Sequence, residues 1–337
     1  MAKATARKVR WGIVSTARIG VEKVIPAMMK SRQLTVAAIA SRSAAAAKRA
    51  ARKLGIPTAY DNYEALFDDP NIDAIYNPLP NHMHVPITLA AAARGKHVLC
   101  EKPIALSAAE AEELKSVPRG VVVAEAFMVR HHPQWQKARA LVRAGRLGEV
   151  RAMQSLFSYF NVNPNDIRNR ADAGGGAAYD IGCYPIVVAR YIFGGEPVRV
   201  IALIDRDPTF ETDRTTSAVI DFGGGRHLTF TVSTQATPYQ RVNILGTKAR
   251  LEVMIPFNAP QGAATTLYLD KGTKLADESA SAINLPKADQ YQLQAEAFGR
   301  VIRGEEALEF GIDDAILQAR VIDAILRSEA SGRWEKP

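Results

Sequence analysis

Short apolar runs alternate with helical stretches along the first 126 residues of the chain. The predicted strands are Val9 to Val14, Leu34 to Ala40, Ile72 to Asn77, His97 to Cys100 and Gly120 to Ala124. The predicted helices are Ile19 to Lys30, Ala44 to Leu54, His82 to Arg94 and Ser107 to Ser116. Strands that alternate with helices at this spacing predict a doubly wound, parallel sheet.

The pattern changes after about residue 126, where strands begin to follow one another directly. The predicted helices are Pro133 to Ala144, Ala177 to Phe193, Ala288 to Arg303 and Asp313 to Ser328. The predicted strands are Val150 to Ser158, Val198 to Leu203, Ser217 to Phe222, Leu228 to Val232, Arg241 to Leu245, Ala249 to Val253 and Thr266 to Leu269. Three glycines, Gly223 to Gly225, predict a hairpin because glycine adopts positive φ without steric cost.

These patterns predict an α/β protein of two domains. Residues 1–126 are expected to form the domain with the parallel sheet. Residues 127–337 are expected to form an α+β domain with a large, mostly antiparallel open sheet and helices on one face. A chain of 337 residues with 47% hydrophobic and 23% charged content is long enough for two cores.

Composition favours a cytoplasmic protein. The start, Met1 to Arg10, is polar and basic and carries no apolar segment of signal-peptide length. The most apolar helical segment, Ile87 to Ala93, is much shorter than a membrane span. Two isolated cysteines, Cys100 and Cys183, indicate neither a disulfide framework nor a zinc site.

The chain is basic, with a formal net charge of +8. Its Lys and Arg residues are spread along the sequence, and the densest cluster, Arg42 to Lys53, lies on an alanine-rich helical stretch. This distribution favours an anionic small molecule over nucleic acid as the ligand.

The turn after the first strand has the small residues of a dinucleotide site. It runs from Gly12 to Gly20, with Ser15 and Ala17 where the usual fingerprint has glycine. An ordinary strand-to-helix turn could have the same composition, so this degraded motif is weak by itself. The candidate contacts to the pyrophosphate are Ser15, Thr16, Ala17, Arg18 and Ile19.

The end of the second strand favours NADP over NAD. Enzymes that use NAD usually place Asp or Glu there against the ribose 2′-hydroxyl, whereas this chain has Ser41, Arg42 and Ser43. A guanidinium and two hydroxyls suit a 2′-phosphate. The alternative is that Ser41 or Ser43 only caps the following helix and Arg42 is solvated.

Two further segments follow the strands that end at Asn77 and Cys100. They hold Leu79, Asn81, His82 and His84 in one case and Glu101, Lys102 and Pro103 in the other. Ligands of an open parallel sheet bind beyond the carboxyl ends of its strands, so both segments are expected near the nicotinamide. No third ligand is spaced to join His82 and His84, and we therefore expect no metal site.

Two long motifs resemble the glucose-fructose oxidoreductase, inositol dehydrogenase and rhizopine-catabolism (Gfo/Idh/MocA) family. One combines Pro80 to His84 with Gly95 to Pro103, and the other runs from Gly174 to Pro185. The similarity covers essentially the whole chain in the expected order. It implies an N-terminal Rossmann domain that binds NADP and a C-terminal domain for substrate binding and oligomerisation.

The resemblance also implies roles for particular residues. Lys102 matches the family lysine beside the reacting carbon, and Tyr184 stands where many members have an acid/base histidine, four residues after Asp180. Tyrosine there is similar to the branch with glucose-fructose oxidoreductase, NADP-dependent xylose dehydrogenases and dihydrodiol dehydrogenases, and it argues against an inositol dehydrogenase. Matches at Arg130 and Arg168 imply cofactor or active-site contacts. The cofactor set is completed by Ser41, Arg42, Leu79, Asn81, His84, Glu101 and Lys102.

The expected chemistry follows from the proton that leaves a hydroxyl when its carbon is oxidised. A tyrosine with a pKa of about 10 is a poor base near neutrality. A nearby Lys102 and the positive nicotinamide ring are expected to lower the pKa of Tyr184, while Asp180 orients Lys102 or a substrate hydroxyl.

The resulting expectation is an NADP-dependent aldose 1-dehydrogenase that acts on a sugar such as xylose or glucose and gives a lactone. The alternatives are a ketosugar or deoxysugar reductase, a cyclic trans-diol dehydrogenase, a sugar–sugar oxidoreductase that retains its NADP, and a non-catalytic NADP-binding sensor. The expected partners are a small sugar or polyol substrate and, through the broad sheet face, further copies of the chain in a homodimer or homotetramer. Neither nucleic acid nor a membrane is expected to bind.

Overall fold

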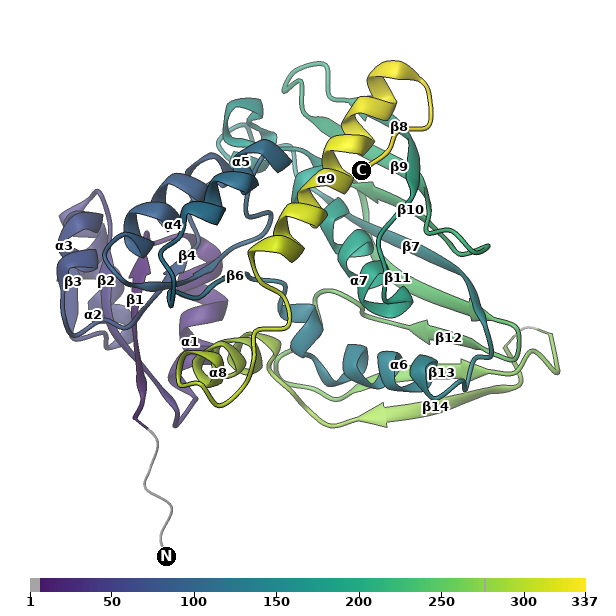
Figure 1. Ribbon diagram of the computed structural model, residues 1–337, viewed down its shortest axis with the longest axis horizontal. Helices are drawn as coiled ribbons and strands as arrows, with labels where there is room; N and C mark the ends of the chain where they lie inside the picture. Colours follow the sequence, from purple (N-terminus) through teal and green to yellow (C-terminus); the bar gives the residue numbers. More distant parts are fainter. Residues whose placement is uncertain (1–6, 276) are drawn as a thin grey trace, which may run out of the picture. The chain divides into compact units, whose positions relative to one another are not determined.

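The computed structural model describes residues 7–275 and 277–337 (Figure 1). Residues 1–6, which hold most of the expected basic start, lie outside the described residues. The chain divides into two compact units. The first unit comprises Met1–Ala105, Ala109–Met128 and Tyr291–Ala315, and the second comprises Leu106–Ala108, Val129–Gln290 and Ile316–Pro337. Tyr291–Ala315 therefore packs with the first unit, although the sequence pattern placed it in the C-terminal domain.

The first unit contains a parallel sheet with strand order β3-β2-β1-β4-β5-β6. Its strands are β1 Val9–Val14, β2 Leu34–Ala40, β3 Thr58–Tyr60, β4 Ala74–Asn77, β5 His97–Cys100 and β6 Val123–Glu125. The strand order reverses between β1 and β4. β1 pairs in parallel with β2 on one side and with β4 on the other. Beyond the carboxyl ends of the strands, such a reversal leaves the crevice in which doubly wound folds bind nucleotides. The predicted parallel sheet is confirmed.

Helices pack on the buried strands of this sheet. They are α1 Ile25–Met29, α2 Ala44–Leu54, α3 Tyr63–Asp68, α4 His84–Ala92, α5 Ala108–Glu112 and α8 Gln290–Ile302. The predicted helix over residues 19–30 is divided, because the π-helical turn Gly20–Val24 precedes α1. The α8 helix contributes Phe298, whose ring centroid lies 5.6 Å from that of the fully buried Trp11. This contact shows how a segment near residue 300 joins the core of the first unit.

The second unit contains an eight-stranded sheet with order β14-β13-β12-β11-β7-β10-β9-β8. Its strands are β7 Val150–Phe160, β8 Arg199–Arg206, β9 Asp213–Asp221, β10 His227–Ser233, β11 Gln235–Gly246, β12 Arg250–Val253, β13 Thr265–Asp270 and β14 Ala280–Leu285. Every pairing is antiparallel except that of β7 with β10. The helices α6 Pro133–Arg143, α7 Cys183–Phe193 and α9 Ile312–Ser331 lie on one face (Figure 1). The predicted open, mostly antiparallel sheet is confirmed.

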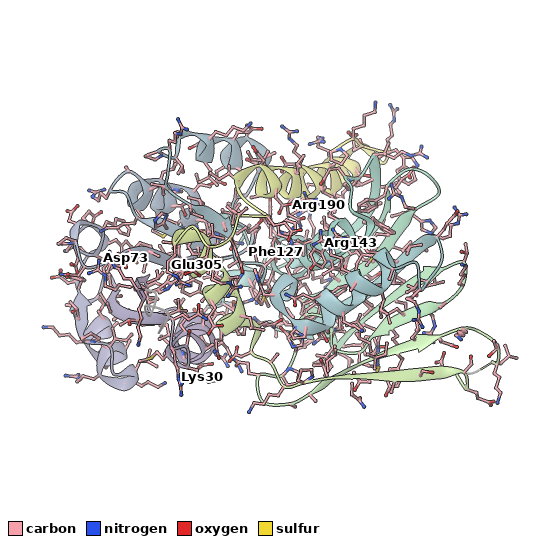
Figure 2. All side chains as sticks on the ribbon, turned by 60° about the horizontal axis from the view of Figure 1, so that its bottom comes forward. Lys30, Asp73, Phe127, Arg143, Arg190 and Glu305 are labelled. Carbon is pink, nitrogen blue, oxygen red and sulfur yellow. The ribbon has the colours of Figure 1, made fainter. Side chains whose placement is uncertain are left out.

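The α7 helix is fixed to α9 by a buried arginine (Figure 2). Arg190 donates through Nε and Nη2 to the two carboxylate oxygens of Glu196, at 2.7 and 2.9 Å. Its Nη1 donates to Oε1 of Gln318 at 3.2 Å, and the amide of Gln318 donates to the carbonyl of Cys183 at 2.9 Å. These bonds define the position of the α7 N-terminus within the second unit.

No helix within residues 7–275 and 277–337 combines the length and apolar character that crossing a bilayer requires.

Candidate active site

The turn after β1 places a serine in a backbone conformation that favours glycine. Ser15 has φ of 70°, which few residues other than glycine adopt. Its N–H donates to the carbonyl of Ala40 at 2.8 Å, and its Oγ accepts from the N–H of Ala17 at 3.2 Å. The chain then enters a helix, since the N–H of Val21 donates to Ala17. The degraded fingerprint therefore still forms a sharp turn that leads from β1 into a helix, and phosphate binding at this turn stays a prediction.

The residues after β2 combine a helix cap with an exposed cation. The Oγ of Ser43 accepts from the N–H of Ala46 at 3.3 Å, so Ser43 caps α2. The Oγ of the buried Ser41 accepts from the N–H of Ser43 at 3.3 Å. Arg42 is exposed, and its charge partly offsets the burial that raises the pKa of Tyr63. The capping alternative thus holds for Ser43, while Arg42 stays accessible at the surface.

The turn after β5 begins with a carboxylate that is already hydrogen-bonded. Glu101 accepts from the hydroxyl of Tyr76 at 2.6 Å. Burial, followed by the charge of Glu101, raises the pKa of Tyr76 well above its ordinary value, so the hydroxyl keeps its proton and donates it. Lys102 comes next and is half-buried. Glu101 is therefore held to the sheet by Tyr76, and its contact with the cofactor stays a prediction.

Leu79, Asn81 and His84 lie beyond β4. Leu79 is buried and Asn81 is half-buried. His84 is fully buried, and its two ring nitrogens lie against the carbonyl oxygens of Leu79 and Pro103. The imidazole is therefore enclosed by protein atoms on the side of both turns, and the predicted cofactor contact of His84 stays a prediction.

The glycine triplet makes room for the helix that follows it. A Cβ on Gly175 would lie 2.5 Å from the carbonyl oxygen of Arg168. Gly176 has φ of 114°, and a Cβ there would lie 1.8 Å from Oδ1 of Asp213. The Oδ2 of Asp213 accepts from the N–H of Ala178 at 2.7 Å and from the hydroxyl of Thr216 at 2.7 Å. Only glycine lets β9 approach closely enough for Asp213 to cap the π-helical turn Ala178–Gly182.

Asp180 lies on this turn and is held by two side chains. Its Oδ2 accepts from the hydroxyl of Tyr159 at 2.7 Å and from Nε of Arg168 at 3.1 Å. Asp180 raises the pKa of Arg168 above its ordinary value. Burial, followed by the charge of Asp180, raises the pKa of Tyr159, so the phenol keeps its proton. The structure therefore brings the predicted residues Asp180 and Arg168 together, and Arg168 also reaches Asp166 at 3.2 Å.

Tyr159 was not identified from the sequence. It lies two residues after Phe157 on β7, and residues two apart on a strand share a face. The predicted strand ended at Ser158, one residue short of it. Extending the alternating pattern by one position would have placed a polar hydroxyl on the face that the helices cover.

Tyr184 is the second residue of α7, one turn after Asp180, and is only 6% exposed. Its ring centroid lies 6.0 Å from that of Phe157 and 5.3 Å from that of Phe257. The segment before Phe257 is anchored by Trp135, whose Nε1 donates to the carbonyl of Pro256 at 2.7 Å. The phenol therefore sits in an apolar aromatic cluster that restricts the orientation of its ring.

Arg130 is 5% exposed and lies on the 3₁₀ turn Met128–His131. Lys102 belongs to the first unit, whereas Arg130, Arg168, Asp180 and Tyr184 belong to the second. The catalytic roles expected for Lys102, Asp180 and Tyr184 stay predictions. Among residues 7–275 and 277–337, no group of three His, Cys, Asp or Glu side chains could hold a metal ion.

Both halves of the chain match family descriptions. Residues 9–123 match an oxidoreductase family with an NAD-binding Rossmann fold. Residues 135–252 match the GFO/IDH/MocA C-terminal domain.

Similar proteins extend over nearly the whole chain. An uncharacterised oxidoreductase of Rhizobium meliloti is 45% identical over 97% of this chain and 98% of that protein. An NADP(+) D-xylose 1-dehydrogenase of Haloferax volcanii is 39% identical over 96% of this chain and 98% of that protein. The crystal structure of KijD10, a 3-ketoreductase from Actinomadura kijaniata in complex with NADP and TDP-benzene, has a TM-score of 0.89 and 29% identity, and the match covers 96% of this chain and 98% of that chain.

Proposed function

Because the chain belongs to the Gfo/Idh/MocA family of oxidoreductases, we propose that it is an NADP-dependent dehydrogenase of free aldoses. It oxidises the anomeric hydroxyl of a sugar such as xylose or glucose and yields a lactone. The observation that carries this proposal is the arrangement on one short helical segment. Asp180 is fixed there by Tyr159 and Arg168, and Tyr184 follows one turn later in an aromatic cluster.

The first unit fits NADP. The positive φ of Ser15 lets the chain turn sharply after β1 without a glycine, which supports a pyrophosphate site there. At the end of β2, Arg42 is exposed and the neighbouring residues Ser41 and Ser43 carry no negative charge. A 2′-phosphate would therefore meet a guanidinium and hydroxyls. Two similar proteins are named with NADP, which supports the same cofactor here.

The chain's residues would divide the work as follows. NADP supplies the acceptor for the hydride that leaves the sugar carbon. Tyr184 would act as its phenolate, after losing its own proton to solvent, and its oxygen would take the proton of the sugar hydroxyl. Lys102 donates a hydrogen bond to that hydroxyl and favours its ionised form through its charge. Tyr159 and Arg168 donate hydrogen bonds to Asp180 and fix the orientation of its carboxylate. This carboxylate would accept a hydrogen bond from a neighbouring hydroxyl of the sugar.

A free aldose is favoured over a ketosugar by the relative similarity of the known enzymes. The xylose dehydrogenase is 39% identical to this chain, whereas a dTDP-3,4-didehydro-2,6-dideoxy-alpha-D-glucose 3-reductase of Streptomyces violaceoruber is 33% identical. Reduction of a ketosugar would use the same residues in the opposite direction, and is the second candidate. It would require Tyr184 to donate a proton rather than accept one.

A panel of aldoses, ketosugars and cyclic diols, followed by nicotinamide absorbance with NADP and NAD in both redox states, tests the proposal. We expect oxidation of an aldose with NADP to be the fastest reaction. Tyr184→Phe should abolish turnover and leave NADP affinity within about threefold, because it removes one hydroxyl. Tyr191→Phe on the same helix is the matched control and should retain activity. Full turnover by Tyr184→Phe would refute the acid/base assignment.

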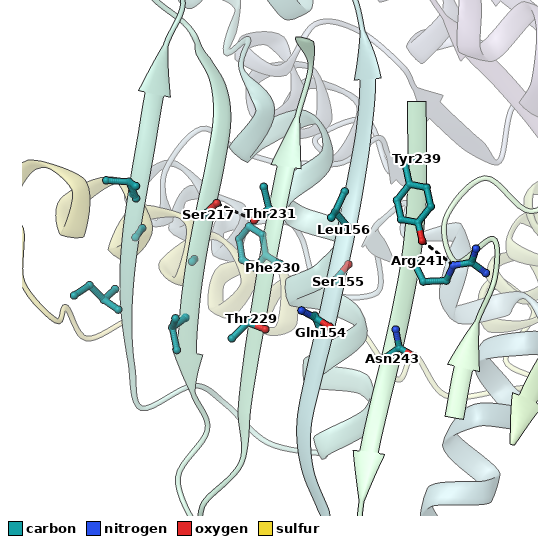
Figure 3. Close-up of a pocket in the computed structure, with 15 residues that line it drawn as sticks. Gln154, Ser155, Leu156, Ser217, Thr229, Phe230, Thr231, Tyr239, Arg241 and Asn243 are labelled. Carbon is teal, nitrogen blue, oxygen red and sulfur yellow. Dashed lines mark hydrogen bonds between the residues drawn. The ribbon is translucent and has the colours of Figure 1, made fainter. Parts of the chain in front are cut away.

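The outer face of the eight-stranded sheet is proposed to bind a second copy of the chain. A groove of about 620 Å³ runs across β7 to β11 on this face (Figure 3). Its walls include Leu156 and Tyr239, which are 42% and 46% exposed, and Leu203, which is 77% exposed. Exposed apolar side chains gathered on one sheet face mark interaction surfaces. The groove is lined by neither Asp180 nor Tyr184, so it is distinct from the candidate catalytic residues.

A further inference from the structure

We infer that His84 is a positioning residue for Lys102, an inference that rests on the proposed function of that lysine. The Nδ1 of His84 lies 2.7 Å from the carbonyl oxygen of Pro103, directly after Lys102. Its Nε2 lies 2.7 Å from the carbonyl oxygen of Leu79. One rigid ring thereby joins the turn after β4 to the turn after β5, at the edge of the sheet where a nucleotide is expected.

The rest of the network fixes the β4 side of this connection. The side-chain amide of Asn77 donates to the carbonyl of His84 at 3.2 Å, and its Oδ1 accepts from the N–H of Leu79 at 3.3 Å. The backbone carbonyl of Asn77 accepts from the N–H of Glu101 at 2.9 Å. The turn after β4 is thus held at several points. Beyond the end of β5, strand pairing no longer holds the chain. There the contact between His84 and Pro103 fixes the backbone that follows Lys102.

Histidine is suited to this position because its two nitrogens lie on opposite sides of a planar ring. The imidazolium can donate to both carbonyls, whereas the neutral ring can donate to only one of them. Burial, helped by the charges of Lys102 and His82 and opposed by the two backbone hydrogen bonds, lowers the pKa of His84 to about 4. The neutral ring therefore prevails near pH 7, and its tautomer decides whether Leu79 or Pro103 receives the hydrogen bond.

The consequence for catalysis is geometric. Lys102 is bracketed by Glu101, whose carboxylate is held by Tyr76, and by Pro103, whose carbonyl accepts from His84 in the tautomer that carries its proton on Nδ1. Both flanking residues are therefore restrained, and the backbone from which the Lys102 side chain extends is held in place. A misplacement of about 1 Å in a reacting group can cost about a hundredfold in rate. Loss of the His84 contact should therefore reduce kcat without removing any group that touches the substrate.

A double-mutant cycle tests this role. We expect His84→Phe to lower kcat at least about thirtyfold and to change NADP affinity less than about fivefold. In a Lys102→Ala background, the same substitution should change kcat less than about threefold, because a residue that acts through Lys102 has nothing left to position. An equal loss in both backgrounds would overturn the inference. His84→Gln, which keeps one N–H donor, should recover part of the activity and replaces His84→Phe if the latter does not fold.

A matched histidine provides the control. His97 is partly buried, whereas His84 is fully buried. The Nδ1 of His97 likewise contacts a backbone group, accepting from the N–H of Val122 at 2.9 Å, but His97 lies at the opposite end of β5. His97→Phe should lower thermal stability and leave kcat within about twofold. A loss of kcat in this variant as large as that in His84→Phe would show that general destabilisation explains both.

A second measurement separates this inference from the proposed function. The rate at which acetic anhydride acetylates Lys102 can be followed by peptide mass spectrometry in the NADP-free protein. His84→Phe should change this rate at least about threefold relative to that of the exposed Lys48 on α2, and His97→Phe should not. A changed rate in a protein that oxidises no sugar would leave the positioning role standing and refute the function. An unchanged rate would refute the positioning role.

Discussion

The hydroxyl of Tyr159 lies 2.7 Å from Oδ2 of Asp180. The same oxygen accepts from Nε of Arg168 at 3.1 Å, so one carboxylate oxygen receives two donors. Because Asp180 raises the pKa of both partners, the phenol and the guanidinium stay protonated and keep donating. The orientation of Asp180 is therefore set by side chains from β7 and from the turn before the glycines.

Removing the Tyr159 hydroxyl should weaken catalysis through Asp180. A hydrogen bond to a charged group contributes about 1.5–3 kcal/mol, which corresponds to roughly a tenfold to hundredfold effect. We expect Tyr159→Phe to lower kcat/KM about tenfold, measured by steady-state kinetics with the best aldose. The same change at Tyr268, on β13, is the control and should have no effect on kcat/KM. Unchanged kinetics in Tyr159→Phe would show that Arg168 alone orients Asp180.

Asp213 should be required for the stability of the second unit. Its Oδ2 caps the turn by accepting a hydrogen bond from the N–H of Ala178, and it accepts a second one from the hydroxyl of Thr216. Asp213→Ala would leave a buried N–H and a buried hydroxyl without their acceptor, at a cost of about 2–4 kcal/mol in the free energy of unfolding. Asp213→Asn keeps an acceptor oxygen and should cost about half as much. Chemical denaturation measures both, and equal stability of Asp213→Ala and the wild type would contradict the capping role.

The sequence predicted the strands of the first unit best where they are mostly apolar and buried. β1, β2 and β5 have the predicted bounds, because each is a mostly apolar segment that is followed by a polar residue. β3 and α3 were missed because they are short and their periodicity covers too few residues to detect. β14 was also missed, since most of its side chains are not buried and its composition resembles a loop.

The candidate site was predictable only along its continuous motifs. The glycine triplet, Asp180 and Tyr184 could be found because they lie within one run of the chain. The partners Tyr159, Asp213 and Phe257 are separated from that run by between about fifteen and seventy residues, and only the fold of the second unit brings them to it. The sequence placed His84 correctly beyond β4. Its contacts with two backbone carbonyls could not be predicted, because every residue has a backbone carbonyl and the partners therefore have no characteristic side chain.

Arg42 should control the choice between NADP and NAD. It is exposed at the start of α2, where a 2′-phosphate is proposed to bind. Arg42→Ala should raise the KM for NADP about tenfold to a hundredfold and leave that for NAD within about threefold, because only NADP carries the phosphate. Arg49→Ala, one to two turns further along the same exposed helix surface, is the control. A wild-type preference for NAD, or equal effects on both cofactors, would contradict this assignment.

His132 should make folding stability depend on pH in the mildly acidic range. It is fully buried, its Nδ1 accepts from the N–H of Gln134 at 3.2 Å, and burial lowers its pKa to about 4. The unfolded chain takes up this proton near pH 6.5, whereas the folded chain resists it down to about pH 4. The stability contribution is therefore complete above pH 6.5 and is lost as the pH falls towards 4.

The size of this effect and its origin can be measured by urea denaturation. The pKa difference corresponds to a loss of up to about 3 kcal/mol between pH 6.5 and 4, and His84 adds a similar dependence. His132→Asn keeps a side-chain acceptor for the N–H of Gln134 and cannot titrate. It should flatten the pH dependence by about half of the histidine contribution. The same slope in variant and wild type would show that His132 is not the titrating group.

Leu203 should be a sensitive position for self-association. It lies on β8 in the groove of the outer sheet face and is the most exposed apolar side chain there, at 77%. A glutamate at this position would place a charge from each copy of the chain inside the interface, and an unpaired buried charge costs several kcal/mol of binding free energy. Light scattering after size exclusion should therefore show Leu203→Glu as a monomer at concentrations where the wild type is a dimer or tetramer. Leu275→Glu changes a side chain that is 90% exposed and lies outside the groove, so it should leave the assembly intact. A wild type that is monomeric at all concentrations would refute the role of this face, because there would be no dimer or tetramer for the face to hold together.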